Sequence, residues 1–258
     1  MIKFFRKIRH NLIKEQKLGK YLIYAIGEII LVVIGILIAL QLNNRNEYNK
    51  SLNNSNVYLR EIVNDLASDT LYLNRMVLNL KKQSSLEDWY LEKTSYTLND
   101  FDSLKSIFPI GIWDFYVEDR TYSKIQNAQE SKLVGYKELY KNITDYYSVS
   151  KKRIEKNAKF EIREASKQVD FVERLNKTIE FNTYKTRDFS GVTLKGNFPQ
   201  MPQKEEDKNN FIALMNKIEA RNYLKSAYER HLLLLLGFDL TKEKATELIS
   251  DIKSTLNE

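Results

Sequence analysis

An uninterrupted apolar run near the N-terminus constrains this chain more than any other feature. Tyr21 to Leu42 read YLIYAIGEIILVVIGILIALQL, with one carboxylate, Glu28, and one amide, Gln41. A helix of this length reaches ~33 Å, enough to cross the ~30 Å hydrocarbon layer of a bilayer. We therefore expect a transmembrane helix over residues 21–42. The alternative is a buried helix of a soluble domain, where so long an apolar run is rare.

Cleavage as a signal peptide is a second alternative for this run. The apolar part of a signal peptide usually spans ~7–15 residues, fewer than are present here. Residues 37–41 read LIALQ and lack a small-x-small cleavage pattern. The sequence therefore predicts a retained signal-anchor.

Basic residues are concentrated before the apolar run. The whole chain has 41 Lys and Arg against 34 Asp and Glu. Seven of the basic residues and one acid, Glu15, lie in residues 1–20, whereas residues 43–258 carry 34 basic and 32 acidic residues. The chain is thus a short basic head on a nearly neutral body. This distribution argues against a nucleic-acid-binding protein, and no nucleic-acid partner is expected.

The basic head also predicts the orientation in the membrane. Only three basic residues, Arg45, Lys50 and Arg60, lie in the 20 residues that follow the span. The positive-inside rule then places the N-terminus in the cytoplasm and residues 43–258 outside. For a bacterial inner membrane, the body would lie in the periplasm.

Residues 1–20 are expected to meet the membrane surface. Phe5, Ile8 and Leu12 fall on one helical face, which is typical of a basic amphipathic helix on anionic lipid. A topogenic segment without fixed structure is the alternative. For the amphipathic helix, four residues are the candidates for membrane-surface contact: Lys3, Arg6, Lys7 and Arg9.

Glu28 is unusual because a carboxylate inside a membrane is costly. Tyr24, Glu28, Gly35 and Ala39 fall within about 40° of one helical face at ~100° per residue. Gly35 and Ala39 form a small-x-x-x-small pair, which permits close approach of another backbone. The sequence thus predicts a packing face around Glu28. The alternative is that Glu28 lies near the inner boundary and extends to the headgroups.

The rest of the chain favours helices. The sequence has 8 Gly and 3 Pro, and long stretches contain neither. A 3-4 spacing of apolar residues, with Asp69 in one slot, predicts a bundle seam on a helix that continues from the span to about Lys82. The seam comprises Leu59, Ile62, Leu66, Leu73, Met76 and Leu80. We expect an all-α protein, with one N-terminal transmembrane helix followed by an antiparallel, coiled-coil-like bundle of about four helices.

Two further apolar stripes support this bundle. One runs from Leu139 to Leu175 and leaves open whether residues 136–180 form one continuous helix. The other runs from Phe211 to Leu235 and is expected to end at Gly237, with Thr241 capping a last helix. Residues 183–207 read as a loop, with a small hairpin around residues 192–194.

Chemistry-bearing motifs are absent from the sequence. There is no Cys and there are two His, and no phosphate-binding glycine loop or nucleophile elbow occurs. We expect no catalytic residues, no cofactor and no metal site, and hence no enzyme. His231 is expected to be a core or rim histidine. The pairs Glu161 with Glu164 and Glu205 with Glu206 are expected to be solvated surface charges.

Two clusters of residues, one basic and one aromatic, each allow two interpretations. The basic stretch from Lys151 to Arg163 is either a solvated helix face or a contact for an anionic partner. The aromatic residues from Trp89 to Tyr116 either fill the end of the bundle or line a ligand pocket.

The first 45 residues resemble a known family. The segments KFFRKIR and KYLIYAIGEIILVVIGILIALQ, followed by Asn43 and Asn44, are similar to the start of an uncharacterised Bacteroidota family of single-pass membrane proteins, a domain of unknown function. The family commonly has Trp where this chain has Arg45. Residues 121–147 are similar in pattern only. The resemblance implies a membrane location and no known activity.

These observations predict three regions: a cytoplasmic head (1–20), a transmembrane helix (21–42) and a periplasmic helical bundle (43–258). The expected function is that of a membrane-anchored interaction or scaffold protein. Its partners would be the lipid bilayer and a second copy or another envelope protein. The alternative is a ligand-sensing bundle that signals through a membrane partner.

Overall fold

The structure is a computed structural model that describes residues 18–108, 110, 117–128, 133–181 and 199–258. Every element in this part of the chain is helical, which confirms the all-α fold class. The helices are α2 (Leu18–Leu91), α3 (Phe101–Ile107), α4 (Arg120–Asn127), α5 (Lys137–Asp145), α6 (Lys151–Ser166), α7 (Val169–Thr178), α8 (Glu205–Met215) and α9 (Ile218–Leu256). A 3-10 turn, η1 (Leu98–Asp100), precedes α3, and a π-helical turn, η2 (Tyr146–Ser150), joins α5 to α6. The expected hairpin near residue 193 lies outside the described residues.

The chain forms two compact units. The first takes residues up to Val57 together with Leu133–Gly135, and the second takes Tyr58–Lys132 and Tyr136–Glu258. In the first unit α2 presents its apolar run without cover: every residue from Ile29 to Asn54 except Ser51 and Leu52 is exposed. One candidate membrane span is found among the described residues, on this helix, with a mean hydropathy of 2.6.

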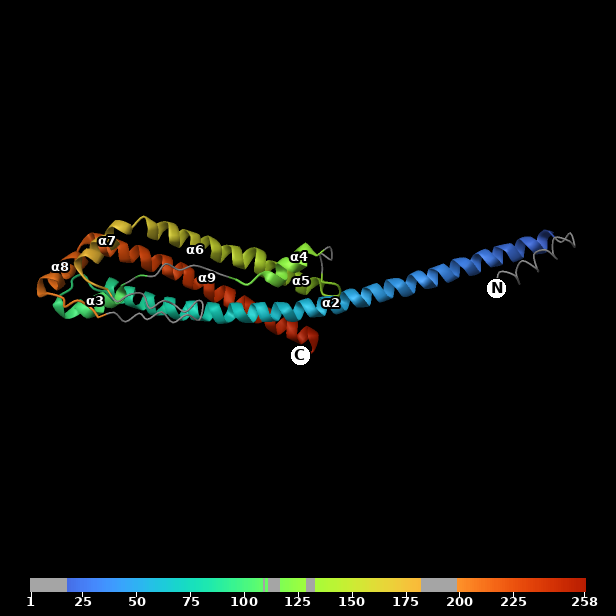
Figure 1. Ribbon diagram of the computed structural model, residues 1–258, viewed down its shortest axis with the longest axis horizontal. Helices are drawn as coiled ribbons and strands as arrows, with labels where there is room; N and C mark the ends of the chain where they lie inside the picture. The colour runs from blue at the N-terminus through green and yellow to red at the C-terminus, as the bar shows by residue number, and fades with distance from the viewer. Residues whose placement is uncertain (1–17, 109, 111–116, 129–132, 182–198) are drawn as a thin grey trace. The chain divides into compact units, whose positions relative to one another are not determined.

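In the second unit α2 continues to Leu91 and forms the predicted seam. All six apolar seam residues from Leu59 to Leu80 are buried. The helix α9 runs antiparallel to α2, since Arg60 pairs with Glu258 and Lys81 with Asp239. Figure 1 shows α6 beside α9, and their apolar faces meet α2 in one core cluster.

The long stripe after Tyr136 is not one continuous helix. It divides into α5, the π-helical turn η2, α6 and α7, with a break at Lys167 and Gln168. The wider π turn admits one extra residue and so shifts the buried face between α5 and α6. As a result both Tyr146 and Tyr147 are buried.

The prediction that a helix ends at Gly237 is wrong. The helix α9 continues through Gly237 and Thr241 to Leu256. A Cβ atom at Gly237 would lie 3.4 Å from Nδ2 of Asn157 and 3.8 Å from Cγ1 of Ile154, both on α6. The missing side chain therefore allows close packing of two helices rather than a helix end.

Substitutions at Gly237 test this packing role. Gly237→Ala is expected to change the free energy of unfolding by less than about 1 kcal/mol, because its helix propensity offsets a tight contact. Gly237→Leu is expected to lower it by about 1–3 kcal/mol through overpacking. Denaturant titration of both variants measures this, and equal effects would contradict a packing role.

The aromatic stretch fills the end of the bundle away from residue 60. Tyr90, Tyr96, Phe101 and Phe108 are buried together with residues of α7, α8 and the start of α9. The Tyr90 hydroxyl donates to the carbonyl of Met215 at 2.7 Å, and the ring of Tyr96 stacks on Tyr90. This agrees with the interpretation as a plug, while residues 111–116 lie outside the described part.

Candidate functional site

The predicted membrane residues lie on the exposed part of α2, as far as they are described. Gly35 and Ala39 are exposed, and a Cβ on Gly35 would meet nothing within 4 Å. Glu28 is half-buried, and the side chain of Tyr24 lies outside the described residues. The surface candidates Lys3, Arg6, Lys7 and Arg9 also lie outside them. The packing face therefore stays a prediction.

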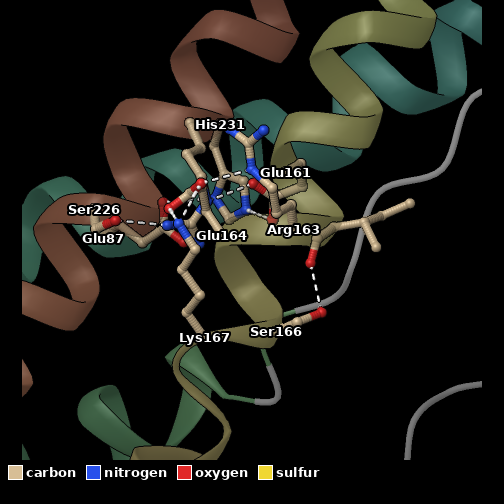
Figure 2. Close-up of polar contacts among 10 residues, drawn as sticks. Glu87, Glu161, Arg163, Glu164, Ser166, Lys167, Ser226 and His231 are labelled. Carbon is tan, nitrogen blue, oxygen red and sulfur yellow. Dashed lines mark hydrogen bonds and ion pairs between the residues drawn. The ribbon is translucent and has the colours of Figure 1, made fainter.

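A network of four charged side chains lies at the centre of the second unit. Glu87 comes from α2, Glu161 from α6, and Arg230 and His231 from α9. None of the four side chains is more than 5% exposed. Figure 2 shows Glu87 and Glu161 pointing toward His231 from two different helices. Three helices thus contribute to one buried cluster.

Direct hydrogen bonds connect the network. Nε of Arg230 donates to Oε2 of Glu161 at 2.7 Å, and Nδ1 of His231 lies 2.9 Å from Oε2 of Glu87. Nε2 of His231 lies 3.6 Å from Oε1 of Glu161. The outer contacts are a bond from Arg230 to Ser226 and one from Gln83 to Glu87.

The electrostatics favour a charged histidine. Burial alone would lower the pKa of His231, but the nearby carboxylates of Glu161 and Glu87 outweigh it and raise the pKa to about 9. Burial would raise the pKa of Glu161, yet His231 and Arg230 hold it below its ordinary value. Two carboxylates then balance two cations, so the buried network is neutral near pH 7.

The arrangement does not suit a metal ion. Glu87 and Glu161 approach opposite nitrogens of the His231 ring, so the three groups do not converge on one point. Groups of three or more metal-ligating side chains are not found in the described residues. The geometry suits a structural lock among three helices, since each helix must hold its register for the charges to stay paired.

A second buried polar group lies about five turns before Glu87 on α2. Asp69 accepts hydrogen bonds from the Tyr146 hydroxyl and from the backbone N–H of Glu118, both at 2.8 Å. Asp65, one turn earlier, accepts from the N–H of Thr121 at 3.1 Å. These two carboxylates thus hold Glu118, the start of α4 and the π turn against α2. Burial raises the pKa of Asp69 to about 6, and the nearby Asp65 adds to the effect.

Asp69→Asn tests this assignment. Asp69 gains a proton on folding between about pH 4 and pH 6, so the stability of the native protein falls as the pH rises through that range. The asparagine variant lacks this loss and keeps the shape of both contacts. Its stability relative to the native protein is expected to rise by about 2–3 kcal/mol from pH 4 to pH 8. Urea titrations at both pH values measure the difference, and a constant difference would contradict the raised pKa.

Sequence reasoning found part of these sites. His231 is a core histidine as predicted, with no exposed side-chain area. The prediction that Glu161 is solvated is wrong, because Glu161 is 1% exposed and pairs with Arg230, whereas Glu205 and Glu206 are exposed as expected. The sequence did contain one signal for the buried network that the predictions from motifs missed. Glu87 continues the 3-4 spacing of the α2 seam beyond Leu80, which indicates a buried position. In the basic stretch Lys151 pairs with Asp119, and Lys152 and Arg153 are exposed.

Comparisons with known proteins match part of the chain to a family model. A model for a family of unknown function, DUF6090, matches residues 28–118, roughly a third of the chain. The match includes Glu28, Asp69 and Glu87 but not the contributions of α6 and α9 to the network. No curated protein and no solved structure matches the chain.

Proposed function

We propose that this chain is a membrane-anchored interaction protein of the bacterial inner membrane, with its N-terminus in the cytoplasm and residues 43–258 in the periplasm. The observation that carries the proposal is the uncovered apolar part of α2. A helix this apolar is stable in water only when something covers it, and a bilayer of ~30 Å fits its length. The basic residues of the head support the orientation.

The scaffold role rests on how the second unit is built. A network of buried charged side chains joins three helices, and we expect it to hold their register. We propose no catalytic activity for this body. A helical body attached to a transmembrane helix is suited to hold a partner protein at a fixed position. The partner we propose is a second copy or another envelope protein, which would contact Glu28, Gly35 and Ala39.

Mild detergent extraction tests the interaction. The native protein is expected to migrate above monomer mass or with a copurifying protein in native mass measurements. The double variant Gly35→Leu, Ala39→Leu removes the small residues and is expected to be monomeric. Gly27→Leu is the matched control, because Gly27 is also a span glycine with nothing within 4 Å and lies ~100° from the Glu28 face.

The outcomes separate the alternatives. A native protein that is monomeric and carries no partner would contradict the scaffold proposal. Equal disruption by Gly27→Leu would contradict the assigned face.

A ligand-sensing bundle is the second candidate function. It is favoured by a cavity of about 280 Å³ between α4 and the junction of η2 with α6. Such a sensor would signal through a membrane partner.

A further inference from the structure

The cavity beside α4 has walls of mixed polar character. Its lining includes Asp119, Tyr122, Ser123, Gln126, Asn127 and Tyr147. Its volume of about 280 Å³ is just below the ~300–1,000 Å³ usual for ligand pockets. The cavity therefore has room for a small molecule rather than a peptide or a lipid chain.

The charges around the cavity balance each other. Two lysines, Lys151 and Lys152, face two acids, Asp119 and Glu155. Lys151 forms ion pairs with Asp119 and, at 3.8 Å, with Glu155. The charges of the lining therefore sum to zero, which does not favour an ionic ligand. The remaining groups are hydroxyls, amides and aromatic rings.

Tyr147 gives the strongest sign of a missing partner. Its side chain is buried, with 4% of its area exposed, and its hydroxyl makes no hydrogen bond to any residue that the structure describes. Burial raises the pKa of this hydroxyl, so it stays a neutral donor. A buried hydroxyl without a partner costs about 1–3 kcal/mol. Tyr147 also belongs to η2, and π turns within helices frequently mark functional sites.

We propose that this cavity binds a neutral, hydroxyl-rich small molecule of about monosaccharide size. Tyr147 bonds a ligand hydroxyl, and Ser123, Gln126 and Asn127 offer further donors and acceptors. The Tyr122 ring, stacked on Tyr147 at 4.6 Å between centroids, supplies a flat apolar wall for the carbon face of a sugar ring. This proposal rests on the second candidate function and names the ligand class for it.

Calorimetry and thermal unfolding of the purified full-length protein test the proposal. The probes are D-glucose and N-acetyl-D-glucosamine, with zwitterionic L-glutamine and anionic inorganic phosphate as counter-probes. At least one sugar is expected to bind and to raise the melting temperature, whereas the counter-probes do neither. Tyr147→Phe is expected to weaken sugar binding about tenfold, the loss of one buried hydrogen bond, without lowering the melting temperature of the free protein.

Matched variants keep the result interpretable. Tyr228→Phe removes a hydroxyl on α9 outside the lining and is expected to bind the sugar as the native protein does. Ser123→Ala weakens binding from the other wall, should Tyr147→Phe fail to fold. Absence of sugar binding, equal binding by both cavity variants and the native protein, or equal binding of phosphate or glutamine would each overturn the proposal. Such a failure leaves the membrane anchoring untouched, because the assay does not depend on it.

Discussion

Replacing Arg230 with methionine is expected to lower the free energy of unfolding by about 3–5 kcal/mol. Methionine keeps much of the length and apolar contact of the arginine but removes its charge. Glu161, which is 1% exposed, then loses its 2.7 Å partner and shares only His231 with Glu87. Breaking one side of a buried ion pair costs this much because a charge stays buried without compensation.

The control is an arginine of the same unit in a surface pair. Arg174 pairs with Glu219, and both side chains are about half exposed. Arg174→Met is expected to change the stability by no more than about 1 kcal/mol. Chemical denaturation of the three proteins in the same detergent measures both effects. A loss below 1 kcal/mol for Arg230→Met would show that the network does not lock the helices.

The charged state of His231 predicts the second large effect. Its pKa rises from 6.5 in the unfolded chain to about 9 in the folded protein, because Glu161 and Glu87 outweigh burial. The native protein thus holds an extra proton between those pH values. The resulting stability is fully present below pH 6.5 and is lost as the pH rises to about 9. The loss amounts to about 3–4 kcal/mol.

His231→Gln isolates this contribution. Glutamine can still bond Glu87 but has no charge to lose, so other titrating groups cancel in the difference between the two proteins. The stability advantage of the native protein over this variant is expected to shrink by about 3–4 kcal/mol from pH 6.5 to pH 9. A pH-independent difference would mean that His231 is neutral in the folded protein.

The all-α fold class could be predicted because helices leave their signals in residues that are close together in the sequence. Six apolar residues from Leu59 to Leu80 follow the helical period, and few Gly and Pro interrupt it, so the α2 seam was predictable. The prediction of a helix end at Gly237 failed because a glycine that ends a helix and a glycine that allows close packing of a neighbouring helix look alike in sequence. Only the nearby Asn157 of α6 distinguishes them.

The buried network could be predicted only in part. His231 was assigned to the core by its apolar neighbours, but its partner Glu87 lies 144 positions away. Glu161 lies in a stretch rich in charged residues, which include Lys159, Arg163 and Glu164, and this charged surrounding hides its buried position. The π turn at Tyr146 has no signal in the local sequence, and the Asp69 carboxylate that accepts a hydrogen bond from the Tyr146 hydroxyl lies 77 positions away on α2.

The most direct test of the account is the side of the membrane on which the body lies. The chain contains no cysteine, so single cysteines report their own position. In Ser254→Cys the thiol lies at an exposed site of α9, and in Lys3→Cys it lies in the basic head. With the inner membrane intact, a membrane-impermeant maleimide is expected to label position 254 and to spare position 3 until the membrane is dissolved. Labelling of position 254 only after the inner membrane is dissolved would contradict the account.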